Sequence, residues 1–590
     1  MKIDLQAVLI EGVEAHQKGD MNTAASRYQR ILSVAPEHAD ANHLLGLVVF
    51  QAEKPGEAER LIRKAISIDD NVALYHANLG RVLKSVNQDM AAVNAFRDAV
   101  QLVPDDAILH ADLASALIGL GDADGARARA YLALEISPDL AEAHLNLGLA
   151  LQELHGPTDG EAEKHLKRAL TLKPDLAGAY LALGVALHEG GDLVGAVTHY
   201  KQAISMNPRF VEAHTNLGNI FRLENDFDAA TRHYRSALDI RDDIADIWGN
   251  LGVTLQEQGD IDAALEAYDR GIALAIDDPE IRRNRGMARL TVGQYDEGWR
   301  DYRYRWQTQR FKEIAREWAQ PEWGGERQKG ARILVHAEQG LGDTIQFSRY
   351  LKVLHDRGFR VTFECPDILQ PLFKGAPYLK SLISPGDPVP RTDFHVPLLN
   401  LPGLLAPDFV NEPHAAPYLS APKTAIKKWQ GLSKHWPLGK RIGIAWRGNP
   451  DHIRDATRSP GLSAFAPLFD IDDVVLISLQ KNNAADELAQ LSSHQRVIDP
   501  TDEINDFGDT AGLMMQLDAV VSCDSAPLHL AGAMGCKTFA VLPHVAEWRW
   551  GLSDEATPWY PSMTLLRQSG IDIDDWKSVF TRLCQELETF

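Results

Sequence analysis

A repeat of 34 residues runs through the first half of this 590-residue chain and constrains its fold more than any other feature. A small residue recurs at this interval, with one step lengthened by two residues around the insertion HGPTDG, at Gly12, Gly46, Gly80, Ala114, Gly148, Gly184, Gly218, Gly252 and Gly286. A second small residue follows each one after twelve residues, or fourteen in the unit with the insertion, at Ala24, Ala58, Ala92, Ala126, Ala162, Ala196, Ala230, Ala264 and Gly298. Several units close with a proline, at Pro36, Pro104, Pro138, Pro174 and Pro208. Nine units in one register predict stacked helix-turn-helix repeats, because small residues are needed where paired helices cross closely.

Units of this length resemble the tetratricopeptide repeat, which stacks into a superhelix with the first helix of each pair on its concave face. Two positions before the repeat glycine, five units carry asparagine: Asn78, Asn146, Asn216, Asn250 and Asn284. Other units hold different residues there, at Ile10, Leu44, Asp112 and Ala182. An amide side chain both donates and accepts hydrogen bonds, so it can hold an extended peptide whatever the side chains of that peptide are.

The array resembles that of the O-linked N-acetylglucosamine transferases, where asparagines at this place hold the substrate polypeptide. The resemblance implies that the five asparagines bind a polypeptide acceptor. The alternative is that they only stabilise neighbouring turns.

The repeat pattern ends in an aromatic and basic segment, WRDYRYRW (Trp299 to Trp306), followed by the turn-rich PEWGGERQKG. We expect these aromatic residues to pack the last repeat against the C-terminal half of the chain. The predicted organisation is a repeat superhelix over 1–299, a connector over 300–328, and two α/β halves over 329–425 and 426–590. The fold class is therefore α plus α/β.

Composition narrows the function. The formal charge of -22 argues against a nucleic-acid binder. The N-terminal sequence carries acids where a signal peptide needs an apolar core, and no apolar run is long enough to span a bilayer. The four cysteines have no metal-ligand spacing. We expect a reduced, cytoplasmic protein without a membrane span or a bound metal.

The second half opens with a strand, a glycine-rich loop, a helix and a second strand: ARILVHA, EQGLGDT, IQFSRYLKVLHDRG and FRVTFEC. Open α/β sheets place their sites at such a turn, at the carboxyl end of a strand. Gly340 and Gly342 allow a ligand to approach the backbone, and Asp343 lies at the helix start, where its charge is stabilised. The turn lacks the full dinucleotide fingerprint, so it does not favour a nicotinamide or flavin cofactor. Asp343 could also be an ordinary helix cap.

A second candidate site is the stretch AVVSCDSAPLHLAGAMG (Ala519 to Gly535). Its apolar start predicts a buried strand, and Asp524 and Ser525 are helix-capping residues. Pro527 suits a first helical turn, so His529 lies close to the helix N-terminus. Backbone donors, the helix dipole and a hydroxyl converge there, which favours a phosphate site. The alternative is an ordinary capped helix with a core histidine.

Polar residues follow four predicted strands of the C-terminal half. They are Arg447, Gly448 and Asn449, then Gln480 and Lys481, then Asp524 to His529, then Trp548 and Arg549. Because the carboxyl ends of parallel strands share one edge, these loops predict a crevice for an anion with a sugar or aromatic group.

These motifs carry a family resemblance. Two α/β halves, with GLGD in the first and D-S-x-x-x-H in the second, resemble a GT-B glycosyltransferase, and in particular the heptosyltransferase-type enzymes. The combination of IAWRGN, SLQK, HLAGAMG and EWRWGL…PWYPSM resembles bacterial fusions of tetratricopeptide repeats with a transferase. Those fusions glycosylate flagellin with a nonulosonic acid such as pseudaminic acid.

The resemblance implies an inverting, metal-independent transferase with Asp343 as the base. It implies that the nucleotide sugar, a CMP-sugar by preference, is bound by Arg447, Asn449, Gln480, Lys481, Asp524, Ser525 and His529. The acceptor would lie at Gly340, Gly342 and the asparagine row. No cofactor is expected beyond this co-substrate.

The predicted function is a protein O-glycosyltransferase whose repeat groove recruits flagellin and whose α/β halves modify serine or threonine. One alternative is a transferase that uses a UDP- or ADP-sugar on another protein or on a glycolipid. Another is an inactive adaptor that only binds partners through its repeats.

Overall fold

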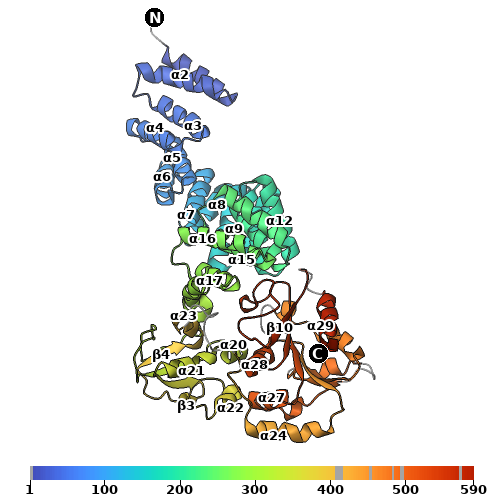
Figure 1. Ribbon diagram of the computed structural model, residues 1–590. Coiled ribbons are helices and arrows are strands. Elements are labelled where there is room, and N and C mark those ends of the chain that lie inside the picture. Colours follow the sequence, from blue (N-terminus) through green and yellow to red (C-terminus); the bar gives the residue numbers. More distant parts are fainter. Residues whose placement is uncertain are drawn as a thin grey trace. The chain divides into compact units, whose positions relative to one another are not determined.

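The computed structural model describes residues 4–405, 416–450, 455–481, 484–491, 497–570 and 575–589. The chain divides into two compact units, Met1–Asp242 and Asp243–Phe590. The first consists of paired helices (Figure 1). The second holds the last helix pairs and two parallel sheets. The predicted order of a helical repeat array followed by α/β structure is confirmed.

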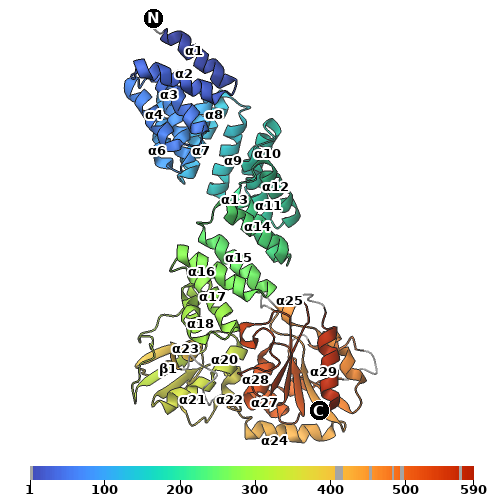
Figure 2. The same cartoon turned by 45° about the horizontal axis from the view of Figure 1, so that its top comes forward.

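The helices of the array alternate in pairs, as the 34-residue period predicts. In the first unit they are α1 (Leu5–Gln17), α2 (Met21–Val34), α3 (Ala39–Gln51), α4 (Pro55–Ile68), α5 (Ala73–Ser85), α6 (Asp89–Leu102), α7 (Ala107–Gly119), α8 (Ala123–Ile136), α9 (Ala141–His155), α10 (Gly160–Leu172), α11 (Ala177–Glu189), α12 (Leu193–Met206), α13 (Val211–Leu223) and α14 (Phe227–Ile240) (Figure 2). The second unit adds α15 (Ala245–Gln258), α16 (Ile261–Leu274), α17 (Pro279–Thr291) and α18 (Tyr295–Tyr302).

The repeat glycines lie where the two helices of a pair cross. In most pairs a large side chain of the second helix covers the glycine, so that a Cβ at Gly218 would stand 2.7 Å from the ring of Tyr234. Only the pair α7–α8 has alanine at this place, Ala114, and sixteen residues later it carries Ala130 instead of a large side chain. The exception follows from the same packing rule, because a Cβ on one helix requires a smaller partner on the other.

We therefore expect Gly218→Ala to destabilise the array by about 1–3 kcal/mol, because the added methyl group displaces Tyr234. Gly56→Ala is the matched control, since Gly56 is exposed in α4 and a Cβ there meets nothing within 4 Å. That change should be neutral or stabilising, because alanine favours a helix by about 1 kcal/mol over glycine. Urea denaturation followed by circular dichroism compares them, and equal midpoints for the two variants would contradict the crossing argument.

The loops between repeats are fixed by one recurring hydrogen bond. A histidine four positions before the small residue places its Nε2 near the carbonyl oxygen of the residue six positions earlier: His76 to Asp70 (2.9 Å), His110 to Pro104 (2.8 Å), His144 to Pro138 (3.0 Å) and His214 to Pro208 (3.3 Å). Asn42 donates to the Pro36 carbonyl in the same way (3.0 Å). Because a carbonyl oxygen only accepts, each of these histidines carries a proton on Nε2.

Two of these histidines meet a second one. The Nδ1 atoms of His144 and His165 lie 2.9 Å apart, and those of His214 and His233 lie 3.1 Å apart. Since Nε2 of His144 and His214 is already a donor, their neutral Nδ1 accepts the proton of the partner. If both rings of a pair were charged, two N–H groups would face each other.

This arrangement makes the stability of the array depend on pH. Burial lowers the pKa of His233 to about 4, helped by the charges of His214, Arg232 and Lys201, and burial also lowers the pKa of His214. The unfolded chain therefore binds more protons than the folded chain below about pH 6.5, so stability falls as the pH drops from about 6.5 to about 4. Thermal denaturation across this window checks the prediction. His233→Gln should flatten the dependence, and an unchanged slope would contradict it.

The second unit contains two all-parallel sheets. The first has the order β3-β2-β1-β4 and comprises β1 (Arg332–His336), β2 (Arg360–Glu364), β3 (Leu379–Ile383) and β4 (Phe394–Pro397). The second has the order β10-β9-β8-β5-β6-β7 and comprises β5 (Lys440–Ala445), β6 (Val474–Ser478), β7 (Val497–Ile498), β8 (Ala519–Ser522), β9 (Thr538–Leu542) and β10 (Met563–Arg567). The central strands are buried on both faces, which explains their continuous apolar runs.

Helices precede, connect and follow these strands. They are α19 (Gln309–Lys312), α20 (Leu341–Phe347), α21 (Arg349–Asp356), α22 (Gln370–Phe373), α23 (Leu401–Leu405), α24 (Lys423–Leu432), α25 (Asp455–Arg458), α26 (Ala484–Leu488), α27 (Phe507–Met514), α28 (Ala526–Met534) and α29 (Lys577–Thr589). Short 3-10 turns include η1 (Arg303–Gln307) and η8 (Trp548–Trp550). Helix α20 of the first half packs against α28 of the second (Figure 1), so the two halves meet beside the predicted site loops.

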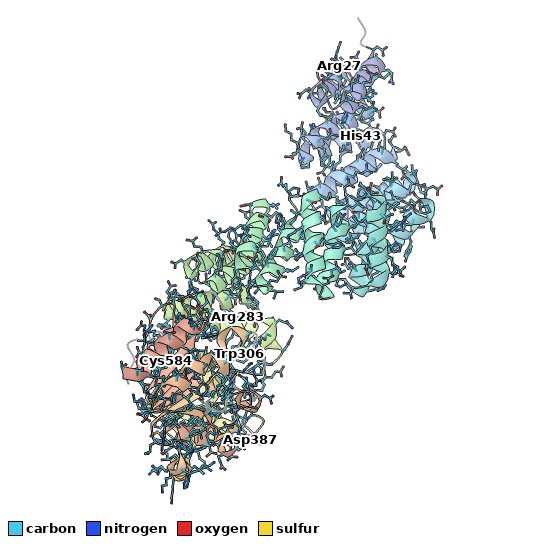
Figure 3. All side chains as sticks on the ribbon, turned by 90° about the vertical axis from the view of Figure 1, so that its right-hand side faces the viewer. Arg27, His43, Arg283, Trp306, Asp387 and Cys584 are labelled. Carbon is cyan, nitrogen blue, oxygen red and sulfur yellow. The ribbon has the colours of Figure 1, made fainter. Side chains whose placement is uncertain are left out.

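The last repeat is joined to the α/β part by its aromatic residues, as predicted. Trp299 is 2% exposed and makes edge contacts with Phe347 (5.9 Å between ring centroids) and Trp548 (5.3 Å). A Cβ on Gly403 would stand 2.7 Å from Trp299, so α18 and α23 touch closely. Trp306, labelled in Figure 3, packs against Phe311 within the connector.

Residues at the end of the repeat array and in the connector also bind the residues just before the glycine-rich loop. The fully buried Arg305 donates to both carboxylate oxygens of Glu338, at 2.9 and 2.7 Å, and Gln339 donates to the Tyr302 hydroxyl at 3.1 Å. Glu338 also accepts from the backbone N–H of Leu399. The residues just before Gly340 are therefore fixed by the end of the repeat array.

Candidate functional site

Asp343 lies in the first turn of α20, directly after β1. Gly340 is the N-cap of this helix and has an extended backbone. A Cβ on Gly342 would stand 2.6 Å from Cδ2 of His529, so the glycine is needed for contact with α28. The structure thus brings together Gly340, Gly342, Asp343 and His529 from the predicted set.

The stretch after β8 folds as predicted. Ser525 is the N-cap of α28, with Pro527 in its first turn, and Gly535 ends the helix in a left-handed conformation. The Ser525 hydroxyl does not cap the helix; it lies 3.0 Å from the Ser522 hydroxyl and bonds to the Cys523 carbonyl. Pro527 has no N–H, and the N–H groups of Leu528 and His529 donate to the Ser525 carbonyl at 3.0 and 3.4 Å, so in this first turn at most the Ala526 N–H can point to a ligand.

His529 is buried between two polar partners. Its Nδ1 lies 2.9 Å from the Tyr560 hydroxyl, and its Nε2 lies 3.5 Å from Oδ1 of Asp524. The ring stacks on Trp550 with centroids 5.4 Å apart. Burial lowers the pKa of His529 against the opposing effect of Asp524, so the imidazole is neutral. A neutral ring that donates to Asp524 through Nε2 accepts the Tyr560 proton on Nδ1.

Asp524 is charged although it is buried. Burial opposes ionisation, but the hydrogen bond from His529 and the charge of Arg549 outweigh it and hold the pKa of Asp524 below its usual range. The charged Asp524 carboxylate can therefore fix the orientation of the His529 ring.

Arg549 connects this cluster to Asp343. Its Nη2 donates to Oδ1 of Asp343 at 2.5 Å, and the two side chains are 10% and 16% exposed. Burial would lower the pKa of Arg549, but the carboxylates of Asp343, Glu547 and Asp524 raise it above its usual range. A charged guanidinium thus lies beside the predicted base.

The loop after β5 is held from two sides. Oε1 of Gln480 accepts from the backbone N–H groups of Trp446 (3.1 Å) and Arg447 (2.9 Å). The exposed Arg447 side chain donates to Glu487 at 2.5 Å, and Asn449 is also exposed. Strand β5 lies between β6 and β8, so this loop is next to the start of α28.

Lys481 follows β6. Its Nζ donates to the carbonyl oxygens of Thr501, at 2.9 Å, and Ile504. The sequence does not indicate these backbone partners. The roles of Arg447, Asn449, Gln480 and Lys481 in binding a nucleotide sugar stay predictions.

Three members of the asparagine row make side-chain contacts within the array, and one of them, Asn284, accepts from Arg283 at 2.9 Å. Nδ2 of Asn78 lies 2.9 Å from Nε2 of His43, and Nδ2 of Asn146 donates to the Ala111 carbonyl at 2.8 Å. Both partners come from the first helix of the preceding repeat, and His43 is labelled in Figure 3. Asn216, Asn250 and Asn284 are partly exposed. A role of the row in holding a peptide stays a prediction.

Two residues that the sequence did not place in the site support it. Tyr560 lies against Gly532 of α28 and contacts His529. Arg349 of α21 is 2% exposed, donates to the Trp559 carbonyl at 3.0 Å and lies 5.1 Å from the Tyr560 ring centroid. Tyr560 lies in the motif PWYPSM, which contributed to the family resemblance but was given no role in the site, and Arg349 lies within a helix that carries no such motif.

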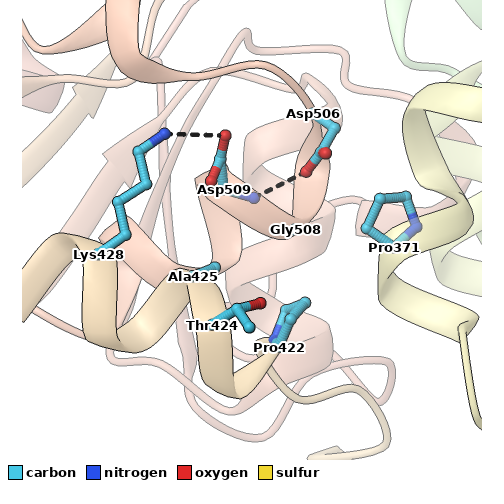
Figure 4. Close-up of a pocket in the computed structure, with 8 residues that line it drawn as sticks. All are labelled: Pro371, Pro422, Thr424, Ala425, Lys428, Asp506, Gly508 and Asp509. Carbon is cyan, nitrogen blue, oxygen red and sulfur yellow. Dashed lines mark hydrogen bonds and ion pairs between the residues drawn. The ribbon is translucent and has the colours of Figure 1, made fainter.

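A separate pocket of about 180 Å³ lies between α22, α24 and α27 (Figure 4). Its polar lining includes Lys428, which forms an ion pair with Asp509 at 3.1 Å. None of its lining residues belongs to the predicted site.

Over the described ranges, no group of three histidine, cysteine or acidic side chains is arranged to hold a metal ion. Within the same residues, no helix has both the length and the apolar character of a membrane span.

Comparisons with known proteins identify the repeats. Family profiles described as TPR repeat or tetratricopeptide repeat match residues 11–73, 78–141, 186–221 and 221–288. Protein FlbA of Caulobacter vibrioides is 23% identical over 333 residues, which are 51% of this chain and 54% of FlbA. The chain therefore spans about half the length of this curated relative.

Solved structures also resemble the chain. The crystal structure of the APC/C hetero-tetramer Cut9-Hcn1 is 16% identical, with a TM-score of 0.39, over 48% of this chain and 55% of the other. YrrB, described as a TPR protein with an unusual peptide-binding site, is 19% identical, with a TM-score of 0.26, over 32% of this chain and 97% of its own.

Proposed function

We propose that this chain is a protein O-glycosyltransferase that transfers a nonulosonic acid of the pseudaminic acid type from its CMP-activated form to serine or threonine of flagellin. The observation that carries the proposal is the ion pair of Asp343 and Arg549 beside the start of α28, where the two parallel α/β halves meet. Asp343 belongs to the GLGD motif that resembles the heptosyltransferase-type enzymes, and Arg549 and α28 belong to motifs that resemble the flagellin transferases.

The chemistry follows from these groups. The hydroxyl oxygen of the acceptor attacks the anomeric carbon, and its proton passes to the Asp343 carboxylate. The bond between the anomeric carbon and the phosphate oxygen breaks, and its electron pair leaves with CMP. Positive charge beside that oxygen stabilises the leaving group. The Arg549 guanidinium and the positive end of the α28 helix dipole supply such charge.

The repeats account for the choice of acceptor in this proposal. A solenoid offers an extended surface that suits a polypeptide better than a small molecule. The partly exposed Asn216, Asn250 and Asn284 are the members of the asparagine row we expect to contact it.

A second candidate is an adaptor that binds a partner without transfer. It is favoured by the fact that Arg447 and Lys481 are bonded to groups of the protein itself. The intact mass of flagellin co-expressed with this chain, with and without a supply of each activated sugar, distinguishes the two. A sugar-sized mass increase only with a CMP-nonulosonic acid supports the proposal, and an unchanged mass with CMP-, UDP- and ADP-sugars supports the adaptor.

A further inference from the structure

Arg549 is incompletely satisfied by its protein partners. Its guanidinium is nearly buried, yet among the described residues only its Nη2 makes a hydrogen bond, to Asp343. Nη1 lies 3.9 Å from Glu547, beyond hydrogen-bond range, and Nε is buried with no partner among the residues the structure describes. A buried donor without a partner costs free energy, so these donors are suited to an incoming acceptor group.

Arg549 is the positively charged side chain in a cluster of ionisable residues. Asp343, Asp524 and Glu547 are the carboxylates around it, and His529 is neutral. Any anion that enters this cluster must therefore be neutralised chiefly by Arg549 and by the start of α28. A planar guanidinium is suited to bind a phosphate or carboxylate through two parallel bonds.

We infer that Arg549 binds the anionic part of the activated sugar and releases Asp343 when it does so. This inference rests on the proposed function and adds a binding residue to it. In the structure Arg549 occupies one oxygen of Asp343, so the carboxylate is not fully available to accept a proton. Binding of the sugar donor draws the guanidinium away and frees that oxygen for the acceptor hydroxyl. The base is then available only after the activated sugar has bound.

Removing the charge of Asp343 is expected to tighten the binding of an anion to Arg549. In the native protein the Asp343 carboxylate competes with the incoming anion for Arg549. Removing that charge in Asp343→Asn should therefore tighten binding of an anion by about tenfold, the effect of one charged hydrogen bond. Arg549→Lys keeps the positive charge but cannot form the bidentate hydrogen bonds of a guanidinium. This change should therefore weaken anion binding by about tenfold.

Isothermal titration of the full chain with CMP, UDP, ADP and inorganic phosphate measures these changes. Two controls separate competition from a general effect of charge. Glu547→Gln removes a nearby carboxylate that makes no hydrogen bond to Arg549, and it should change affinity less than Asp343→Asn does. Asp393→Asn breaks the more exposed ion pair with Arg332, also 2.5 Å long, and should change nothing.

Tighter binding in Asp343→Asn supports the inference even if Arg549→Lys does not fold. Unchanged or weaker binding in Asp343→Asn overturns it, as does a native chain that binds none of the four probes. Failure of the inference and failure of the proposed function can be told apart. Shifted affinities with unmodified flagellin would overturn the transfer proposal alone, whereas modified flagellin with unshifted affinities would overturn the inference alone.

Discussion

Asp343→Asn is expected to lower the rate of sugar transfer by about 10²–10⁴-fold while the protein stays folded. The two side chains are nearly isosteric, and an amide oxygen can still accept the hydrogen bond from Arg549. The amide cannot take the proton of the acceptor hydroxyl, so only the chemical step is lost. The measurement is the rate at which flagellin gains mass at saturating activated sugar.

A second substitution shows whether the loss is chemical. Asp524 is 4% exposed and accepts from His529, so Asp524→Asn should lower the melting temperature as well as activity. Asp343→Asn should lower the melting temperature less than Asp524→Asn does, because its side chain is more exposed and the amide oxygen still accepts from Arg549. Transfer at the native rate by folded Asp343→Asn protein would show that another group is the base.

The repeat array could be predicted because its rules are local in sequence. Most of the repeat glycines meet a side chain sixteen or eighteen residues later, so both residues of each helix crossing lie within one repeat unit. The exception at Ala114 with Ala130 shows that the same rule operates without glycine. Apolar runs likewise predicted β1, β2, β5, β6, β8 and β9, which are confirmed.

The edge strands were harder to predict. The sequence did not indicate β3, β4, β7 or β10. Strand β7 has only two residues, and β3 is only partly buried, so neither forms a long apolar run. A pattern of burial cannot mark a strand that is short or half-exposed.

The site itself could be predicted only in part. Asp343 and His529 each follow a strand, so their loops were recognisable, and Arg549 was placed at a strand end without a role. Its ion pair joins residues 206 positions apart, and the contact of Tyr560 with His529 joins residues 31 apart. The ion pair depends on how the two halves pack and the other contact on how the loops of the second half fold together, and no local pattern contains either. The carbonyl partners of Lys481 were missed for the same reason.

The second large effect concerns the residue at which the independently folding α/β part begins. A chain cut at Gln328, the predicted boundary, is expected not to fold, whereas a chain beginning at Asp243 should fold. The cut removes Trp299 and Trp323, which are 2% and 1% exposed, together with the fully buried Arg305. Loss of a buried tryptophan costs about 3–5 kcal/mol, and loss of one partner of a buried ion pair costs a similar amount.

These losses together reach or exceed the total stability of an ordinary domain, about 5–15 kcal/mol. Glu338 would be left with Leu399 N–H but without its guanidinium, and Phe347 and Trp548 would lose the ring between them. Circular dichroism and proteolysis of the two truncated chains measure the difference. A single change, Trp299→Ala in the longer chain, should lower its stability by about 3–5 kcal/mol. If the chain cut at Gln328 instead melts cooperatively at the temperature of the longer one, the last repeat is only an attachment, and the predicted boundary stands.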